Sequence, residues 1–144
     1  SSDVCSSDLV ADAVYRSGAE SVTLSNPLLG MVLDPSTGRP ALGAGGGGYS
    51  GAPVHAVAVR TVFDVRAALP HLPIVGVGGV FTAWDAAELL LAGANAVQVG
   101  TATFADPAAP VLVQRGLLAW CATRGVGVAE LSGLAHRGGL PPLR

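Results

Sequence analysis

Residues 73–79 read Pro-Ile-Val-Gly-Val-Gly-Gly, an apolar run that leads directly into two glycines. The run predicts a buried strand because it is short, rich in apolar residues and bounded by proline and glycine. Thr82 and Asp85 follow with the spacing of a capping box, which predicts that a helix begins there. Gly93 is placed to end this helix. The segment is therefore predicted to form a strand, a glycine turn and a helix.

The same order of elements recurs before and after this unit. Further strands are expected at residues 21–24 and 96–99. Further helices are expected at residues 10–17, 55–69 and 111–123, and Asp106 is placed to cap the last of them. Residues 27–53 are rich in glycine and proline and are expected to form a long loop. Strands that alternate with helices pair in parallel, so the sequence predicts an α/β fold.

The chain length limits which α/β fold is possible. Doubly wound sheets and (β/α)8 barrels both show this alternation. A complete barrel needs about 250 residues, and the chain has 144. The units present amount to about half a barrel, so we expect two open sheet edges and a bare inner face.

Composition excludes several classes of function. Only 12% of the residues are charged, the net charge is −2, and no basic cluster is present, which argues against nucleic-acid binding. No apolar run reaches the roughly 18 residues of a membrane span. Cys5 and Cys121 lack metal-site spacing, so no metal site is expected, and a reducing, cytoplasmic setting fits. Residues 1–9 show no periodicity and are interpreted as a non-native or disordered segment before a single domain at residues 10–144.

Candidate functional residues follow the expected strands. Asn26 follows the first, Gly78 and Gly79 the second, and Gly100 and Thr101 the third. Glycine lets backbone N–H groups approach an anion closely, and a helix that starts after the turn adds a favourable dipole. Each glycine turn alone could equally be a tight connection, but their occurrence at successive strand ends favours a phosphate site.

The other candidate residues are expected to have structural rather than functional roles. His55 begins a helix and is expected on the surface, and His71 and His136 are expected to be solvated in loops. Cys121 is expected in the core of the last helix. Asp34 and Asp85 are interpreted as a turn residue and a helix cap, respectively.

Several motifs together resemble class 1 dihydroorotate dehydrogenases. Residues 25–34 (Ser-Asn-Pro-Leu-Leu-Gly-Met-Val-Leu-Asp) are similar to the strand-six segment of that family. Residues 47–51 (Gly-Gly-Tyr-Ser-Gly) resemble its glycine-rich loop, and residues 73–79 and 93–102 resemble its last two strands. Residues 131–136 resemble its tail. The resemblance runs from about residue 10 to residue 136 and implies the C-terminal half of a (β/α)8 (TIM) barrel, with strands 6–8 and their helices.

The resemblance implies an FMN enzyme that oxidises dihydroorotate to orotate in pyrimidine (UMP) biosynthesis. It assigns Asn26 and Pro27 to the substrate site, although Pro27 replaces the usual Thr or Ser and removes one hydroxyl hydrogen bond. His55 stands where Lys is common, and Ala56 where Pro is common. The residues assigned to FMN are Ser25, Gly51, Gly78, Gly79, Gly100 and Thr101.

The resemblance also implies what the chain lacks and what it binds. The family's catalytic base, a Cys in class 1, lies in a loop before strand five, so no catalytic residue is assigned here and the chain is expected to be inactive alone. The motifs look closer to the NAD-linked subtype, whose members pair with an iron–sulfur flavoprotein subunit, which implies a homodimer or heterotetramer. Alternatives are the related barrel of dihydropyrimidine dehydrogenase, a non-flavin barrel with a phosphorylated substrate, and a non-catalytic remnant.

Overall fold

A computed structural model describes residues 7–142 of the chain, and its centre is a three-stranded parallel sheet. The strands are β1 (Val22–Leu24), β4 (Ile74–Val77) and β5 (Ala96–Gln98). They lie in the order β1-β4-β5, with Thr23 opposite Val75 and Val75 opposite Ala96. The predicted parallel α/β arrangement is confirmed, and all three carboxyl ends lie at one edge of the sheet.

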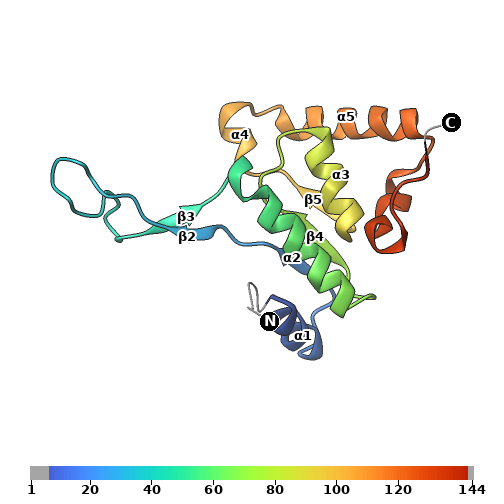
Figure 1. Cartoon of the computed structure of the whole chain (residues 1–144), viewed down its shortest axis with the longest axis horizontal. Helices are drawn as coiled ribbons and strands as arrows, with labels where there is room; N and C mark the ends of the chain where they lie inside the picture. The colour runs from blue at the N-terminus through green and yellow to red at the C-terminus, as the bar shows by residue number, and fades with distance from the viewer. Residues whose placement is uncertain (1–6, 143–144) are drawn as a thin grey trace.

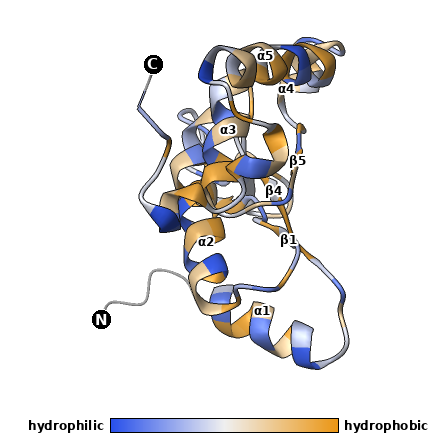
Figure 2. Cartoon of the chain, turned by 90° about the vertical axis from the view of Figure 1, so that its right-hand side faces the viewer, coloured by the Kyte–Doolittle hydropathy of each residue, from blue (hydrophilic) through white to orange (hydrophobic). Residues whose placement is uncertain are grey.

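Helices cover one face of this sheet (Figure 2). The long helices are α1 (Ser7–Arg16), α2 (His55–Ala68), α3 (Ala83–Ala92) and α5 (Ala109–Arg124). The short helical segments are η1 (Ala52–Val54), α4 (Ala102–Ala105), η2 (Val128–Leu131) and η3 (Leu134–Arg137). Helix α3 packs between α2 and α5, while α1 lies against the other side of α2.

The core lies between the sheet and these helices. Val62, Val65, Ile74 and Leu89 are fully buried there, and Leu131 of η2 closes the far end. Side chains of a strand alternate between its two faces, and the residues that point away from the helices are exposed at Thr23, Ala96 and Gln98. Within the described residues, the sheet therefore has one covered face and one face open at both edge strands, as expected.

The segment after β1 forms a hairpin that extends away from the body of the molecule (Figure 1). Strands β2 (Leu28–Gly30) and β3 (Gly47–Tyr49) pair antiparallel, with Leu28 opposite Tyr49. The expectation of a loop without strands at residues 27–53 was wrong here. The glycines of β3 give no alternation of apolar and polar side chains, so the backbone pairing left no signal in the sequence.

Most predicted helix ends agree with the structure, with three corrections. The capping box of Thr82 and Asp85 is present, and Gly93 ends α3 as predicted. Asp106 does not cap α5, whose N-cap is Ala108; instead the Asp106 carboxylate accepts a hydrogen bond from the Ala108 N–H at 2.8 Å. Helix α4 was not anticipated.

The third correction concerns the start of the chain. Helix α1 begins at Ser7, so residues 7–9 are helical rather than without regular structure, and the rest of the segment interpreted as non-native or disordered, including Cys5, lies outside the described residues. Gly18, with φ 95°, follows the helix and its N–H donates to the Tyr15 carbonyl, as expected of a terminating glycine. No helix among residues 7–142 combines the length and the apolar character that crossing a membrane requires.

Candidate functional site

A pocket of about 290 Å³ lies where the strands of the sheet end. It contains all eight residues assigned to FMN or substrate from the sequence: Ser25, Asn26, Pro27, Gly51, Gly78, Gly79, Gly100 and Thr101. Ser50, Val54, Val77 and Phe104 complete its lining. The carboxyl ends of parallel strands meet at one edge, which is where α/β proteins place their binding sites. The geometry thus brings together residues that are up to 76 positions apart in the sequence (25 and 101).

The turn after β4 is shaped by close packing. Gly78 and Gly79 have φ values of 136° and 66°, which L side chains rarely adopt. A Cβ on Gly78 would lie 2.6 Å from the Ala58 Cβ, and a Cβ on Gly79 would lie 2.8 Å from the Gly51 carbonyl oxygen. Both glycines are therefore required by the fold, which holds this turn against α2 and η1.

The turn after β5 is open by comparison. A Cβ on Gly100 would meet no atom within 4 Å, and its φ lies outside the left-handed region. The Thr101 hydroxyl donates to the Ser50 hydroxyl at 3.2 Å, which links this turn to the end of the hairpin. Among the described residues, we find no hydrogen-bond partner for the backbone N–H groups of Gly79, Gly100 and Thr101. The two turns thus offer donors to a ligand.

The end of β1 forms the third wall. The Ser25 N–H donates to the Val77 carbonyl at 3.0 Å, which ties this segment to β4, and the Leu24–Ser25 peptide bond is cis. Asn26 is exposed, so its amide is available to a ligand. Pro27 packs against the hairpin, since a Cβ on Gly48 would lie 2.9 Å from the Pro27 Cβ. Pro27 consequently shapes the wall without offering a hydrogen bond.

The lining suits a phosphorylated ligand but provides no acid or base. The hydroxyls of Ser25, Ser50 and Thr101, the Asn26 amide and the backbone N–H groups can all donate hydrogen bonds to phosphate oxygens. The space beside Gly100 is open and belongs to the pocket, so a bound group can approach the backbone there closely. No Cys, His, Lys, Asp or Glu is among the residues lining this pocket. The site can bind and orient a ligand, and a proton acceptor would have to come from elsewhere.

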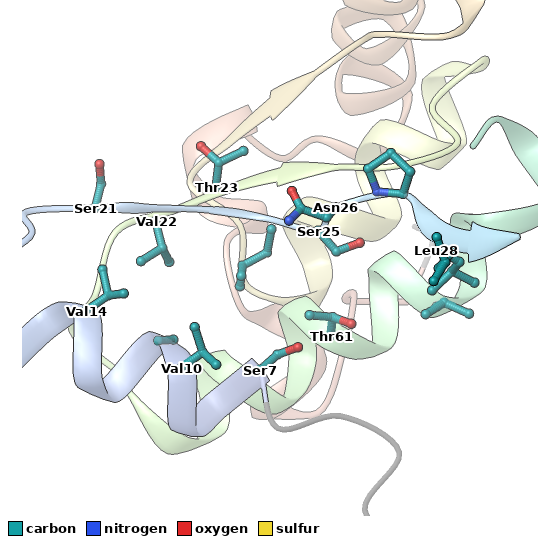
Figure 3. A pocket seen from close by; sticks show the side chains of 15 residues that line it. Ser7, Val10, Val14, Ser21, Val22, Thr23, Ser25, Asn26, Leu28 and Thr61 are labelled. Carbon is teal, nitrogen blue, oxygen red and sulfur yellow. The ribbon is translucent and has the colours of Figure 1, made fainter. Parts of the chain in front are cut away.

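A larger cavity of about 610 Å³ adjoins the first along the free edge of β1 (Figure 3). Val10 and Val14 of α1 project towards Val22 of β1, and Thr61 of α2 lies on its floor. Its lining is mostly apolar, and it shares Ser25, Asn26 and Pro27 with the smaller pocket. We regard the smaller pocket as the binding site because it holds the polar groups and the glycine turns.

His55 was wrongly expected on the surface. Its side chain is only 13% exposed, and it lies beneath the turn after β4, where Nδ1 is 2.8 Å from the Gly78 carbonyl oxygen. Nε2 lies 3.3 Å from Glu88 Oε2 and 4.0 Å from Asp85 Oδ1. The acids are on α3, so no local pattern around His55 could have revealed this cluster.

Asp85 is both a helix cap and a neighbour of His55. Burial by itself raises the pKa of the Asp85 carboxyl. Hydrogen bonds from the backbone N–H groups of Phe81 and Thr82 and from the Thr82 hydroxyl lower it, as does the charge of His55, and together they leave the pKa below its ordinary value. The carboxylate is therefore ionised at neutral pH.

The other singled-out residues lie away from the pocket. His71 is exposed, as expected. His136 is largely exposed but is not free, because its ring stacks on Phe63 at 3.9 Å and its Nε2 lies 2.9 Å from the Ala92 carbonyl oxygen. Cys121 is buried in the core as predicted, and burial raises the pKa of its thiol. Asp34 forms a turn as predicted, with its carboxylate accepting from Ser36 and Thr37.

Comparison with known proteins assigns a family to this arrangement. The sequence model described as dihydroorotate dehydrogenase matches residues 2–120. The catalytic subunit of dihydroorotate dehydrogenase B (NAD(+)) from Desulforamulus reducens is 44% identical over 128 residues, which are 88% of this chain and 42% of that relative. A putative dihydroorotate dehydrogenase A (fumarate) from Pediococcus pentosaceus is 47% identical over 109 residues, 76% of this chain and 36% of that relative.

A solved structure agrees with the sequence relatives. The crystal structure of the dihydroorotate dehydrogenase of Eimeria tenella in complex with ferulenol aligns with a TM-score of 0.74 and 28% identity, over 91% of this chain and 35% of that one. The chain thus spans about two fifths of the length of the relatives that it matches. The sequence relatives and the solved structure indicate the same family. The chain therefore belongs to the dihydroorotate dehydrogenase family.

Proposed function

We propose that this chain provides the FMN-phosphate site and part of the substrate site of an FMN-dependent dihydroorotate dehydrogenase, which oxidises dihydroorotate to orotate in pyrimidine biosynthesis. The observation that carries the proposal is the convergence of Ser25, Asn26 and the turns after β4 and β5 on one pocket. When bound, FMN supplies the hydride acceptor for such an oxidation. The resemblance of the chain to catalytic subunits that bear this name supports the assignment.

The protein residues act by holding and orienting the bound molecules. The backbone N–H groups of Gly79, Gly100 and Thr101 would hold the FMN phosphate, with the Thr101 hydroxyl beside them. Asn26 can both donate to and accept from the planar ring of orotate or dihydroorotate, and Ser25 next to it would contact the flavin. Because the lining contains no proton acceptor, we propose that the residues present here do not complete catalysis by themselves.

The open edge of the sheet supports a half-barrel arrangement. In a closed barrel every strand has two neighbours, whereas β1 and β5 each have one among the described strands. We propose that β1, β4 and β5 correspond to strands 6–8, and that the cavity between α1 and the free edge of β1 lies where a preceding unit would pack. The name of the relative from Desulforamulus reducens, a catalytic subunit, favours an electron-transfer subunit as partner.

The test uses protein expressed from the complete coding sequence that contains these residues. We expect flavin absorbance in the purified protein, and a change in that absorbance when orotate binds beside the flavin. Asn26→Ala should retain the flavin and weaken orotate binding by at least tenfold, because a hydrogen-bonding partner of the ring is lost. Gln114→Ala, which removes an exposed amide on α5 outside the pocket, is the control.

Two results would overturn the proposal. One is protein that is folded but does not take up FMN. The other is an Asn26→Ala variant that binds orotate as tightly as the Gln114→Ala control. Turnover of dihydrouracil in preference to dihydroorotate would assign the site to the related dihydropyrimidine dehydrogenase barrel instead.

A further inference from the structure

His55 links the glycine turn after β4 to helix α3. It is the first residue of α2, and its ring lies directly behind the turn. The Gly78 carbonyl oxygen is 2.8 Å from Nδ1, and a Cβ on Gly79 would lie 2.7 Å from the His55 Cβ. The position of this side chain therefore fixes the position of the turn.

The second ring nitrogen faces two carboxylates. Nε2 lies 3.3 Å from Glu88 Oε2 and 4.0 Å from Asp85 Oδ1, and it is buried without a hydrogen bond. The other oxygen of Asp85, Oδ2, is already occupied by the backbone N–H groups of Phe81 and Thr82 at 2.9 and 2.7 Å. The oxygen that faces His55 is thus the one that the helix cap leaves available.

This geometry favours the protonated form of the ring. A carbonyl oxygen can only accept a hydrogen bond, so Nδ1 must carry a proton. If His55 were neutral, the lone pair of Nε2 would face two negatively charged groups in a largely buried position. With a second proton, the same contacts become attractive ion pairs, and buried charges are stable only when paired in this way.

We propose that His55 is a positioning residue which, in its protonated form, ties the glycine turn of the FMN-phosphate site to Asp85 and Glu88 and offsets part of their charge. This inference rests on the proposed function. With both carboxylates ionised, the net charge of the three side chains is −1 when the ring is protonated and −2 when it is neutral. Loss of the proton leaves an additional negative charge behind a site for an anion, and it weakens the link between the turn and α3.

The charged neighbours of the ring come from one helix. Among the described residues, Asp85 and Glu88 on α3 are the charged groups that face it, while β4 is apolar and η1 contains no charged residue. The turn after β5 contributes Gly100, Thr101 and Phe104 to the pocket, none of them charged. Removing a positive charge from this position should therefore lower the affinity of the site for a phosphate.

The test measures FMN affinity by flavin fluorescence at neutral pH in protein from the complete coding sequence. His55→Lys retains a positive charge, whereas His55→Gln has none. The readout is the ratio of dissociation constants of variant and wild type. We expect His55→Lys to bind FMN nearly as tightly as wild type, and His55→Gln to bind it several-fold more weakly.

A second variant and a second measurement distinguish the proposed role of His55 from poor folding of a variant. Glu88→Gln removes one carboxylate, and combined with His55→Gln it should restore part of the lost FMN affinity, because less negative charge is left behind the site. In urea denaturation His55→Gln should have a lower free energy of unfolding than His55→Lys, because the ion pairs to α3 are lost. If FMN fails to bind, the proposed function fails, and this difference in stability still decides whether His55 links the turn to α3.

Three outcomes would overturn the inference. The first is FMN binding of equal affinity in wild type, His55→Lys and His55→Gln. The second is a His55→Gln variant that is as stable as His55→Lys in urea denaturation. The third is a stoichiometric divalent metal ion that is lost in His55→Gln, because His55, Asp85 and Glu88 have ligand atoms within 4.8 Å of one another and a cation could replace the proton.

Discussion

The turns after β4 and β5 both contain glycine at the carboxyl end of a strand, but for different reasons. At Gly79 an added Cβ would lie 2.7 Å from the His55 Cβ and 2.8 Å from the Gly51 carbonyl oxygen. At Gly100 it would meet no atom within 4 Å. The fold therefore explains the first glycine and leaves the second unexplained. The proposed FMN phosphate, if it occupies the space beside Gly100, would supply a reason for the second glycine.

The largest effect on folding is expected at the crowded turn. Gly79→Ala should lower the free energy of unfolding by about 2–4 kcal/mol, because it adds backbone strain at positive φ to a clash with backbone atoms. Urea denaturation followed by circular dichroism measures the change. Gly38→Ala is a matched control, since Gly38 has nearly the same φ, 65° against 66°, but no atom within 4 Å of an added Cβ. Equal losses in the two variants would show that packing does not explain the turn.

A smaller effect is expected where the same turn leads into α3. Asp85→Asn should lower the free energy of unfolding by about 1 kcal/mol near neutral pH, because the charged acceptor of the Phe81 and Thr82 N–H groups is lost. The pKa of Asp85 is lowered in the folded protein. Its contribution is therefore present above the ordinary Asp value and is lost as the pH falls through the folded pKa.

The pH dependence of the free energy of unfolding distinguishes the role of Asp85 as a hydrogen-bond acceptor from a general effect of removing a charge. The difference between wild type and Asp85→Asn in urea denaturation should shrink as the pH is lowered from about 7 to about 3. Asp64→Asn, which breaks an exposed pair with Arg60 on α2, is the control and should change the free energy of unfolding by less than about 0.5 kcal/mol. A difference that is independent of pH would mean that the Asp85 charge does not stabilise the turn.

The comparison of the two turns also shows which structural features can be predicted from the sequence. The strands and the glycine turns were predictable because each depends on a few consecutive residues, such as the apolar run before Gly78. The grouping of Asn26, Gly79 and Thr101 was predictable as well, because parallel strands end at one edge.

Other features depend on contacts between distant segments. His55 was misplaced because its partners Asp85 and Glu88 are contributed by α3, and the sequence around His55 resembles any polar helix start. The β2–β3 hairpin was missed because Gly47 and Gly48 carry no side chains that could alternate. The functional assignments of the pocket residues remain predictions, since the geometry brings them together without identifying the ligand.

The smallest effect on folding is expected at the open turn, and it decides the comparison. Gly100→Ala should change the free energy of unfolding by less than about 0.5 kcal/mol, because the added methyl group meets no protein atom. The same variant should weaken FMN binding by about tenfold, or about 1.4 kcal/mol, since the methyl group would occupy space proposed for the phosphate, and flavin fluorescence measures the affinity. Unchanged affinity in a stable variant would place the ligand elsewhere. A large loss of stability would instead mean that packing requires glycine in both turns, and Gly100 would no longer support a binding site after β5.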